Sequence, residues 1–477
     1  MVVVTKMFFI SFFDNYIAIS SLIALGELMD GIKFLFGPLP FGKAPFIILL
    51  TTLLSGGYLI LNPIEDSAVT LRLWTFASNH LEPYQKAVPS FEMNHPGSNI
   101  DVQLVHGDAV NSRLRAAFWA DLDVPDLVEI EISRAGSFFR GPSEEVGFID
   151  LLPILKKTGY YDRIVETRFA PYTNRGKIYG LPHDVHPVVL AYRRDLFENL
   201  GINVESIETW DDFIRIGTEI TIPGQRYLIE LSDNSAMHFE IFLFQRDGGY
   251  FNREGDLIMD NEVALETLLF FIPMVAGSER IGSDLGTYRL FTQAVEQGYF
   301  LSFLCPDWRS KVAESDIPRM SGNMALMPLP AVVPGSRRTS TMGGTMLGIT
   351  KACPNPELAW KVAEHMYFDK DELGERFRDT NILPPLKEAW SHPAFDESRD
   401  YWSGQKLGRI YADLADDVPP QFASPLIEMA KSKMASVISV CSAYYRTNGE
   451  KGFEEFARSK LLAAGNEVRR YIDRNPF

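Results

Sequence analysis

Residues that could support covalent chemistry are few and scattered in this chain of 477 residues. The sequence contains no GxSxG elbow, no GxGxxG turn, no phosphate-binding P-loop and no HExxH pair. Paired carboxylates such as Asp121 and Asp123 could serve a glycosidase, whose two carboxyl groups lie about 5–10 Å apart. With 62 acidic residues, however, close pairs are expected by chance. The patterns favour binding over catalysis.

Two further groups of side chains could hold a metal or a reactive thiol. In the run from His183 to His186, an extended backbone would direct the two imidazoles to opposite faces, so we predict no metal site. The thiols Cys305, Cys353 and Cys441 lack CxxC spacing and are too few for a disulfide scaffold. We predict buried thiols, and neither a metal nor a cofactor.

The overall composition is that of an ordinary globular protein of two or three packing units, at roughly 150 residues per unit. Acidic side chains outnumber basic ones by 62 to 46, which gives a net charge of -16. Binding to phosphate backbones requires a surplus of lysine and arginine. We therefore predict no nucleic-acid partner.

The N-terminal part differs from the rest, because the 21 residues from Ala44 to Ile64 carry no charge. As a helix they would span about 31 Å, the thickness of a bilayer's hydrocarbon core. Lysines such as Lys43 precede the segment and Glu65 follows it, so the positive-inside rule places the larger part of the chain outside the cytoplasm. We predict a retained transmembrane helix at 44–64 rather than the alternative, a cleaved signal. The role of residues 1–43 stays open.

From Val69 onward the pattern alternates between strands and helices. Apolar residues recur with a period of two at 69–74 and 100–104 and with helical spacing at 84–91 and 110–118, and 126–130 after Pro125 is a third predicted strand. This order predicts parallel pairing in an open α/β sheet, which binds ligands at the carboxyl ends of its strands. The residues just after those ends are Trp74, Phe76, Ser78, Asn79 and His80, and then Glu129, Glu131 and Ser133.

Several segments in order resemble the bacterial extracellular solute-binding proteins of family 1, the maltose-binding-protein-like sugar binders that supply ABC transporters. The likeness covers roughly residues 68 to 470. The segments that carry it are His95-Pro96-Gly97, Pro125-Asp126-Leu127-Val128, Tyr179-Gly180-Leu181-Pro182, Tyr192-Arg193-Arg194-Asp195-Leu196-Phe197, Thr209-Trp210-Asp211-Asp212-Phe213, Gly248-Gly249 and Gly343-Gly344-Thr345-Met346-Leu347-Gly348.

The resemblance implies a type II periplasmic-binding-protein-like fold, with two α/β lobes, a hinge and a ligand cleft between the lobes. The N-lobe would comprise 68–184 and 333–383, and the C-lobe 185–332 and 384–477. The chain would cross between them near 182–191, 328–347 and 382–386.

A sugar site needs aromatic planes for the sugar's C–H faces, and carboxylates and amides for its hydroxyls. Each candidate also has a structural interpretation, as core packing or as part of a turn. For Trp210, at a predicted helix start, surface packing is preferred. The aromatic candidates are Trp74, Tyr192, Tyr250 and Trp308; the polar candidates are Ser78, Asn79, His80, Glu131, Asp184 and Asp307; and Gly343 and Gly344 would let backbone amides approach the ligand.

The resemblance, together with the uncharged segment 44–64, implies a membrane-anchored, extracytoplasmic binding component of an ABC importer, which captures a carbohydrate by hinge closure and delivers it to a permease. A membrane-tethered sugar sensor with the same fold and a secreted carbohydrate-active enzyme are the alternatives. The sequence identifies neither the sugar nor the permease.

Overall fold

The computed structural model describes residues 48–55, 69–120 and 122–474. The chain divides into two units, Met1–Ala68 and Val69–Phe477. Among the described residues, no helix combines the length and apolar character needed to cross a membrane. The predicted membrane segment 44–64 lies mostly outside these residues; its described residues, 48–55, are helical.

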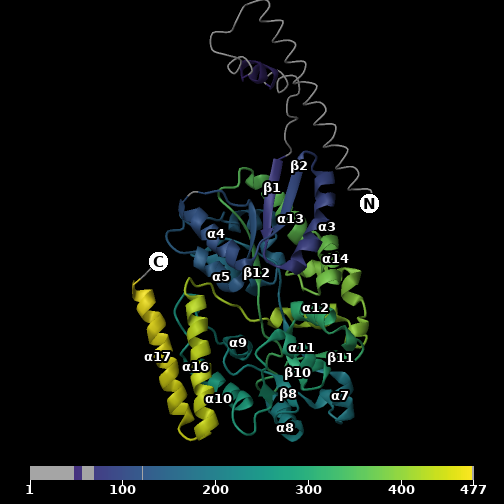
Figure 1. Ribbon diagram of the computed structural model, residues 1–477, viewed down its shortest axis with the longest axis vertical. Helices are drawn as coiled ribbons and strands as arrows, with labels where there is room; N and C mark the ends of the chain where they lie inside the picture. The colour runs from purple at the N-terminus through teal and green to yellow at the C-terminus, as the bar shows by residue number, and fades with distance from the viewer. Residues whose placement is uncertain (1–47, 56–68, 121, 475–477) are drawn as a thin grey trace, which may run out of the picture. The chain divides into compact units, whose positions relative to one another are not determined.

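The first of two five-stranded sheets has the order β2-β1-β3-β12-β6 (Figure 1). Strand β1 pairs in parallel with β2 and β3, as the alternation of strands and helices predicts. Strand β12, from much later in the chain, joins antiparallel to β3. The strands are β1 (Val69–Thr75), β2 (Ser98–Leu104), β3 (Leu127–Glu131), β6 (Leu181–Pro182) and β12 (Thr345–Ile349).

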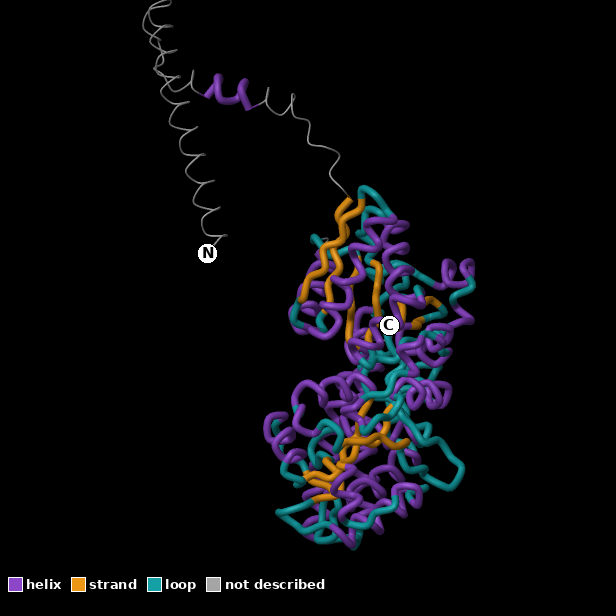
Figure 2. The backbone as a smooth tube through the Cα atoms, turned by 90° about the vertical axis from the view of Figure 1, so that its right-hand side faces the viewer, coloured by secondary structure: helices purple, strands orange, loops and turns teal. Residues whose placement is uncertain are grey.

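The second sheet has the order β11-β7-β10-β8-β9 and combines parallel and antiparallel pairs. Figure 2 shows the two sheets as separate groups of strands, each surrounded by helices. We call the sheet containing β1, with its helices, the first lobe, and the sheet containing β7, with its helices, the second lobe. The strands are β7 (Val188–Arg193), β8 (Tyr227–Glu230), β9 (Gly282–Ser283), β10 (Phe300–Pro306) and β11 (Met324–Pro328).

Helices cover both sheets, and in the second lobe the long helices α16 and α17 lie side by side at one edge (Figure 1). The first lobe contains α3 (Ser78–Asn94), α4 (Gly107–Ala120), α5 (Ile132–Ala135), α6 (Leu152–Thr158), α13 (Pro356–Phe368) and α14 (Lys370–Thr380). The second contains α7 (Arg194–Asn199), α8 (Trp210–Ile220), α9 (Ala236–Gln245), α10 (Glu262–Val275), α11 (Tyr288–Glu296), α12 (Asp307–Asp316), α15 (Leu407–Leu414), α16 (Ile427–Asn448) and α17 (Phe453–Arg474).

Three segments that run between the lobes are hydrogen-bonded to one another. The amide of His183 donates to Thr345, that of Val185 to Leu383, and that of Val188 to Ser340. The first segment joins β6 to β7 and the second joins β11 to β12, so each connects strands of different sheets. The crossings therefore form one narrow bundle on which the two lobes meet.

Each lobe has its own apolar core, and the core of the second lobe contains Trp210. This residue, expected at the surface, is only 1% exposed and packs in the core of the second lobe. The surface prediction is wrong because α9 covers the indole, whose Nε1 donates to Gln245 at 2.9 Å. The predicted burial of all three cysteine thiols is confirmed.

Candidate functional site

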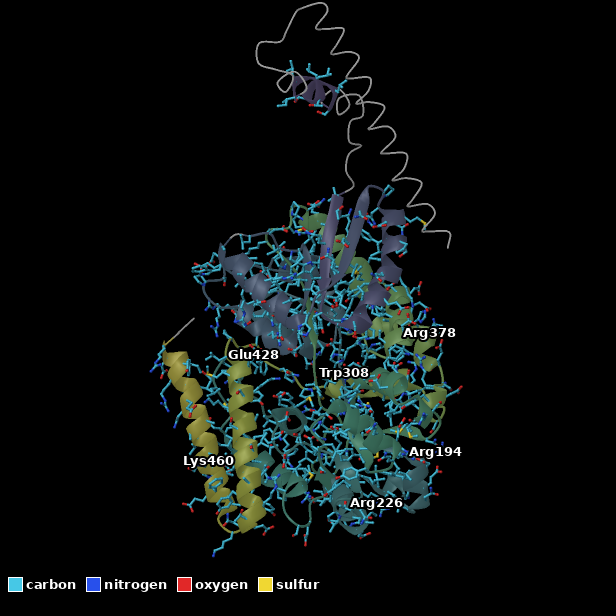
Figure 3. All side chains as sticks on the ribbon, viewed as in Figure 1. Arg194, Arg226, Trp308, Arg378, Glu428 and Lys460 are labelled. Carbon is cyan, nitrogen blue, oxygen red and sulfur yellow. The ribbon has the colours of Figure 1, made fainter. Side chains whose placement is uncertain are left out.

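A cavity of about 380 Å³ lies between the lobes, next to the crossing segments. We call it the cleft. Figure 3 shows Trp308 between the elements of the two lobes. The cleft is lined from the first lobe and the crossings by Phe76, Ala77, Asn79, His80, Glu131, Gly343, Gly344, Thr345 and Ile382, and from the second lobe and its connections by His186, Met237, Glu240, Trp308, Met342 and Lys431.

Two neighbouring cavities share lining residues with the cleft. One, of about 450 Å³, shares Phe76 and Glu131 and extends over the start of α4. The other, of about 230 Å³, shares Lys431 and includes Tyr250 of the turn after α9. The space between the lobes is therefore long enough for a ligand larger than one sugar ring.

Helix starts place the candidate side chains along the cleft. Helix α3 begins directly after β1, which brings Asn79 and His80 to the carboxyl end of the first sheet. Helix α12 begins directly after β10, so Trp308 lies in its first turn. The indole Nε1 of Trp308 donates to the carbonyl of Met342 at 3.1 Å, which fixes the ring against the second crossing.

The structure brings together six of the predicted residues as cleft lining, namely Asn79, His80, Glu131, Trp308, Gly343 and Gly344. Ser78 is exposed at the start of α3 and lies outside this lining. Trp74 donates to Gln103 at 3.1 Å, and the guanidinium of Arg113 lies over its ring. Tyr192 is buried in the second lobe beside Phe197, and Tyr250 lines the smaller neighbouring cavity.

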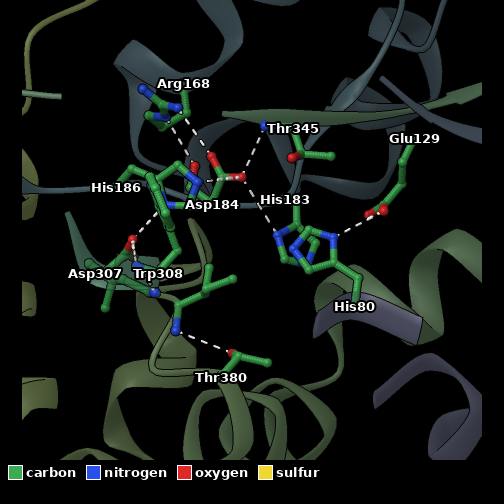
Figure 4. A network of polar contacts seen from close by, with 12 residues as sticks. His80, Glu129, Arg168, His183, Asp184, His186, Asp307, Trp308, Thr345 and Thr380 are labelled. Atoms are coloured by element: carbon green, nitrogen blue, oxygen red, sulfur yellow. Dashed lines mark hydrogen bonds and ion pairs between the residues drawn. The ribbon is translucent and has the colours of Figure 1, made fainter. Parts of the chain in front are cut away.

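Asp184 and Asp307 lie beneath the cleft rather than on its surface, and both are fully buried. Asp184 accepts bonds from the guanidinium of Arg168 and the amide of Thr345, and Asp307 accepts the amide of Leu383. These contacts join residues of all three crossings, and Figure 4 shows those of Asp184 with Arg168 and Thr345. In this structure the two carboxylates connect the three crossing segments.

Sequence reasoning missed the polar pair that faces Glu131 across the cleft. Lys431 Nζ donates to Glu240 Oε2 at 2.9 Å, and the hydroxyl of Tyr250 donates to Glu240 Oε1 at 2.8 Å. Burial raises the pKa of Glu131, whereas the charges of Glu240 and Glu131 outweigh burial and raise the pKa of Lys431. Because Lys431 is about 190 residues from Glu240, no local motif connects them. The cleft thus offers acceptors and donors for hydroxyl groups beside aromatic rings.

A buried cluster of His80, Glu129 and His183 has donor atoms close enough to hold a metal ion. The hydrogen bonds of this cluster differ from those of a metal site, because Glu129 already accepts hydrogen bonds from Thr75, His80 and Tyr84. The two imidazoles are stacked, with ring centroids 4.0 Å apart and planes inclined by 22°, so their in-plane lone pairs do not converge. The three side chains therefore form a buried contact between a carboxylate and two histidines, and their geometry does not fit a shared metal ion.

His183 makes this cluster sensitive to acid. Its Nδ1 lies 3.6 Å from Asp184 Oδ2, and neither ring nitrogen makes a hydrogen bond with a described residue. Burial and the neighbouring His80 lower the pKa of His183 from 6.5 to about 4. As the pH falls, the imidazole of His183 therefore takes up a proton in the unfolded state before it does so in the folded state. The contribution of neutral His183 to the free energy of unfolding is fully present above pH 6.5 and is lost as the pH falls towards 4.

We expect His183→Phe, which keeps a ring stacked on His80, to flatten the loss of unfolding free energy between pH 6.5 and pH 4. Urea unfolding at a series of pH values measures the slope. His106→Phe, at an exposed side chain, should keep the wild-type slope. An equally steep loss in His183→Phe and the wild type would contradict the prediction.

Gly343 allows close packing at the cleft wall. Its φ is +91°, and an added methyl would lie 3.3 Å from both His186 Cδ2 and Trp308 Nε1. We expect Gly343→Ala to weaken ligand binding in the cleft about tenfold, because overpacking displaces the indole. Gly335→Ala is the matched control, since Gly335 has φ +77° and no described atom within 4 Å of the added methyl. Titration calorimetry of both variants checks this, and equal affinities would contradict it.

Comparison with solved structures shows the fold. The sugar-binding protein MalE from Xanthomonas citri superposes with a TM-score of 0.70 at 19% identity, covering 85% of this chain and 99% of that one. A cyclo/maltodextrin-binding protein complexed with maltotetraose gives a TM-score of 0.65 at 18% identity, with 84% and 97% covered. The two-lobe α/β arrangement expected from the sequence is thus confirmed.

Sequence comparison gives related proteins. An arabinooligosaccharide-binding protein of Bacillus subtilis is 28% identical over 386 residues, which is 78% of this chain and 87% of that protein. A lactose-binding protein of Rhizobium radiobacter is 24% identical, with 73% and 82% covered. The family model described as bacterial extracellular solute-binding protein matches residues 77–372. The chain therefore belongs to the bacterial extracellular solute-binding protein family.

Proposed function

We propose that this protein captures a carbohydrate between its lobes and delivers it unchanged to the permease of an ABC importer. The observation that carries the proposal is the cleft itself, where Trp308 and Phe76 supply ring faces and Glu131, Glu240 and Lys431 supply hydrogen-bonding groups. The predicted lobes, 68–184 with 333–383 and 185–332 with 384–477, would close as two rigid bodies on the ligand. Closure needs a ligand that binds the closed form more tightly, and no covalent step.

The ligand class that we propose is a short oligosaccharide of pentose units. Two observations support it: the cleft adjoins two further cavities between the lobes, and relatives in Bacillus subtilis and Halalkalibacterium halodurans are arabinooligosaccharide-binding proteins. A micromolar Kd corresponds to about −8 kcal/mol, which a few stacked rings and hydrogen bonds can provide.

A thermal-shift screen of the full-length protein tests this function. Arabinotriose, maltotriose, lactose and the monosaccharides arabinose and glucose form the panel. The true ligand should stabilise the protein by RT ln(1 + [L]/Kd), about 2.7 kcal/mol at a hundredfold excess over Kd. We expect arabinotriose to stabilise the protein more than arabinose does. Failure of every sugar in the panel would reject the proposed ligand class.

We also propose that segment 44–64 anchors the protein in the membrane, with the lobes on the extracytoplasmic side. Its 21 uncharged residues, between Lys43 and Glu65, support this. The protein should then stay with membranes after washing with alkaline carbonate, whereas a chain with arginines in place of Leu49 and Leu53 should be released. Release of the wild-type protein by the wash would reject the anchor.

A further inference from the structure

One largely buried side chain of the cleft wall, that of His186, contacts both of the carboxylates that join the crossings. His186 Nε2 lies 3.1 Å from Asp184 Oδ2, and its Nδ1 lies 2.5 Å from Asp307 Oδ1. Figure 4 shows the ring between the two acids. Its backbone has φ +54°, an uncommon conformation for a residue with a side chain, so the chain turns here out of a regular extended path. The sequence-based assumption of an extended backbone through His186 is therefore wrong.

The contacts of the two ring nitrogens favour a protonated His186. A neutral imidazole has one donor and one acceptor nitrogen, whereas an ionised carboxylate only accepts. With one carboxylate oxygen 2.5 Å from Nδ1 and another 3.1 Å from Nε2, the imidazolium can donate to Asp307 and pair with the charge of Asp184 at the same time. The charge balance also favours the imidazolium, because Asp184 and Asp307 are fully buried and Arg168 supplies just one compensating positive charge. A protonated His186 makes this four-residue cluster neutral.

The two acids that His186 joins also hold the other crossing segments. Asp184 Oδ2 accepts the amide of Thr345 at 2.9 Å, on the second crossing. Asp307 Oδ2 accepts the amide of Leu383 at 2.7 Å, on the third, and Asp307 Oδ1 accepts the amide of Trp308 at 2.6 Å. One ring on the first crossing is thereby connected to both others and to the helix turn that carries Trp308.

We propose that His186 is a positioning residue for ligand binding: as an imidazolium it fastens the three crossings together through Asp184 and Asp307 and so fixes Trp308 at the cleft. The proposal rests on the proposed function in one respect, the role of Trp308 as a ligand contact. His186 itself contributes mainly through the residues that it holds.

The electrostatic surroundings support a positive charge on His186 at neutral pH. Burial lowers the pKa of His186, but the charges of Asp184 and Asp307 outweigh it and raise the pKa to about 9. Arg168 faces His186 only across Asp184, and His183 lies on the far side of the same carboxylate. The other charged side chains that line the cavity beside His186 are Glu131, Glu240 and Lys431.

The first experiment needs no sugar. In histidine- and tryptophan-labelled full-length protein, NMR should show one histidine with both nitrogens protonated up to pH 8, and this signal should vanish in His186→Gln. The indole N–H resonance of Trp308, identified by Trp308→Phe, should shift in His186→Gln. His238→Gln is the control, because His238 is also buried but bonds Ser232 within the second lobe. A neutral His186 at pH 7, or an unmoved Trp308 resonance, would overturn the proposal.

The second experiment uses arabinotriose with the same variants. We expect His186→Gln to bind it at least tenfold more weakly, with His238→Gln unchanged. Asp307→Asn combined with His186→Gln should bind more tightly than His186→Gln alone, because the double variant leaves no uncompensated carboxylate at position 307. Equal affinity of His186→Gln and the wild type would refute the positioning role. If the wild type binds no sugar, the ligand proposal fails, while the NMR result still decides whether His186 is charged and holds Trp308.

Discussion

Asp184→Ala is expected to lower the free energy of unfolding by about 3–5 kcal/mol, because it removes the carboxylate partner of the buried Arg168 guanidinium and one of the two carboxylates beside His186. Arg168 donates to both the carboxylate and the carbonyl of Asp184, and all of these atoms are buried. His186 would lose one of its two carboxylates, and the amide of Thr345 would lose its acceptor. Urea unfolding followed by circular dichroism measures the change.

The matched control for this variant is an ion pair on the surface. Arg163 and Glu388 form a bond between partly exposed side chains that likewise connects distant parts of the chain. Glu388→Ala should have a much smaller effect, because solvent screens exposed pairs. Similar losses of unfolding free energy for the two variants would show that the buried cluster of Arg168, Asp184, His186 and Asp307 stabilises the fold no more than a surface ion pair does. A free energy of unfolding in Asp184→Ala equal to that of the wild type would lead to the same conclusion.

Trp308→Ala is expected to weaken arabinotriose binding by about 2 kcal/mol, roughly thirtyfold, while the sugar-free protein stays folded. The indole lines the cleft, is only partly buried, and is held by a single side-chain bond to Met342. Its removal therefore takes away a ring face for the sugar without opening the core of either lobe. Titration calorimetry gives the affinity, and thermal unfolding without sugar reports on the fold.

Trp119→Ala controls for the loss of a tryptophan, because the Trp119 side chain is 94% exposed at the end of α4. It should bind the sugar as the wild type does. If Trp308→Ala unfolds in the absence of sugar, the indole is a structural residue and its assignment to the ligand site is wrong. If Trp308→Ala folds and binds normally, the sugar lies elsewhere between the lobes.

Local sequence patterns predicted the opening of the fold correctly. The alternation of buried and exposed residues along β1 and the helical stripe in α3 depend only on neighbouring residues, so both could be read from the chain. Helix α3 nevertheless starts at Ser78, earlier than the apolar stripe begins, which turns the predicted strand-end residues Asn79 and His80 into a helix start. This early start brings their side chains to the cleft.

The same patterns could not separate the candidate aromatic residues. Trp74 and Trp308 both occur where a strand meets the following loop or helix, yet only Trp308 lines the cleft. Tyr192 lies in β7, where every residue is buried, so alternation cannot show which way a side chain points. Trp210 lies in a capping box typical of surface helices, but a different helix covers it.

By itself, the sequence determined the family, the order of the first strands and helices, the burial of the cysteines and the place of Trp308 after a strand, because each depends on residues that are close along the chain. The tertiary structure alone decided which polar groups face one another. Lys431 meets Glu240, and His186 lies between Asp184 and Asp307, only because two sheets and three crossings pack together. Contacts between residues so far apart depend on how whole elements fill space, and no spacing in the sequence records them.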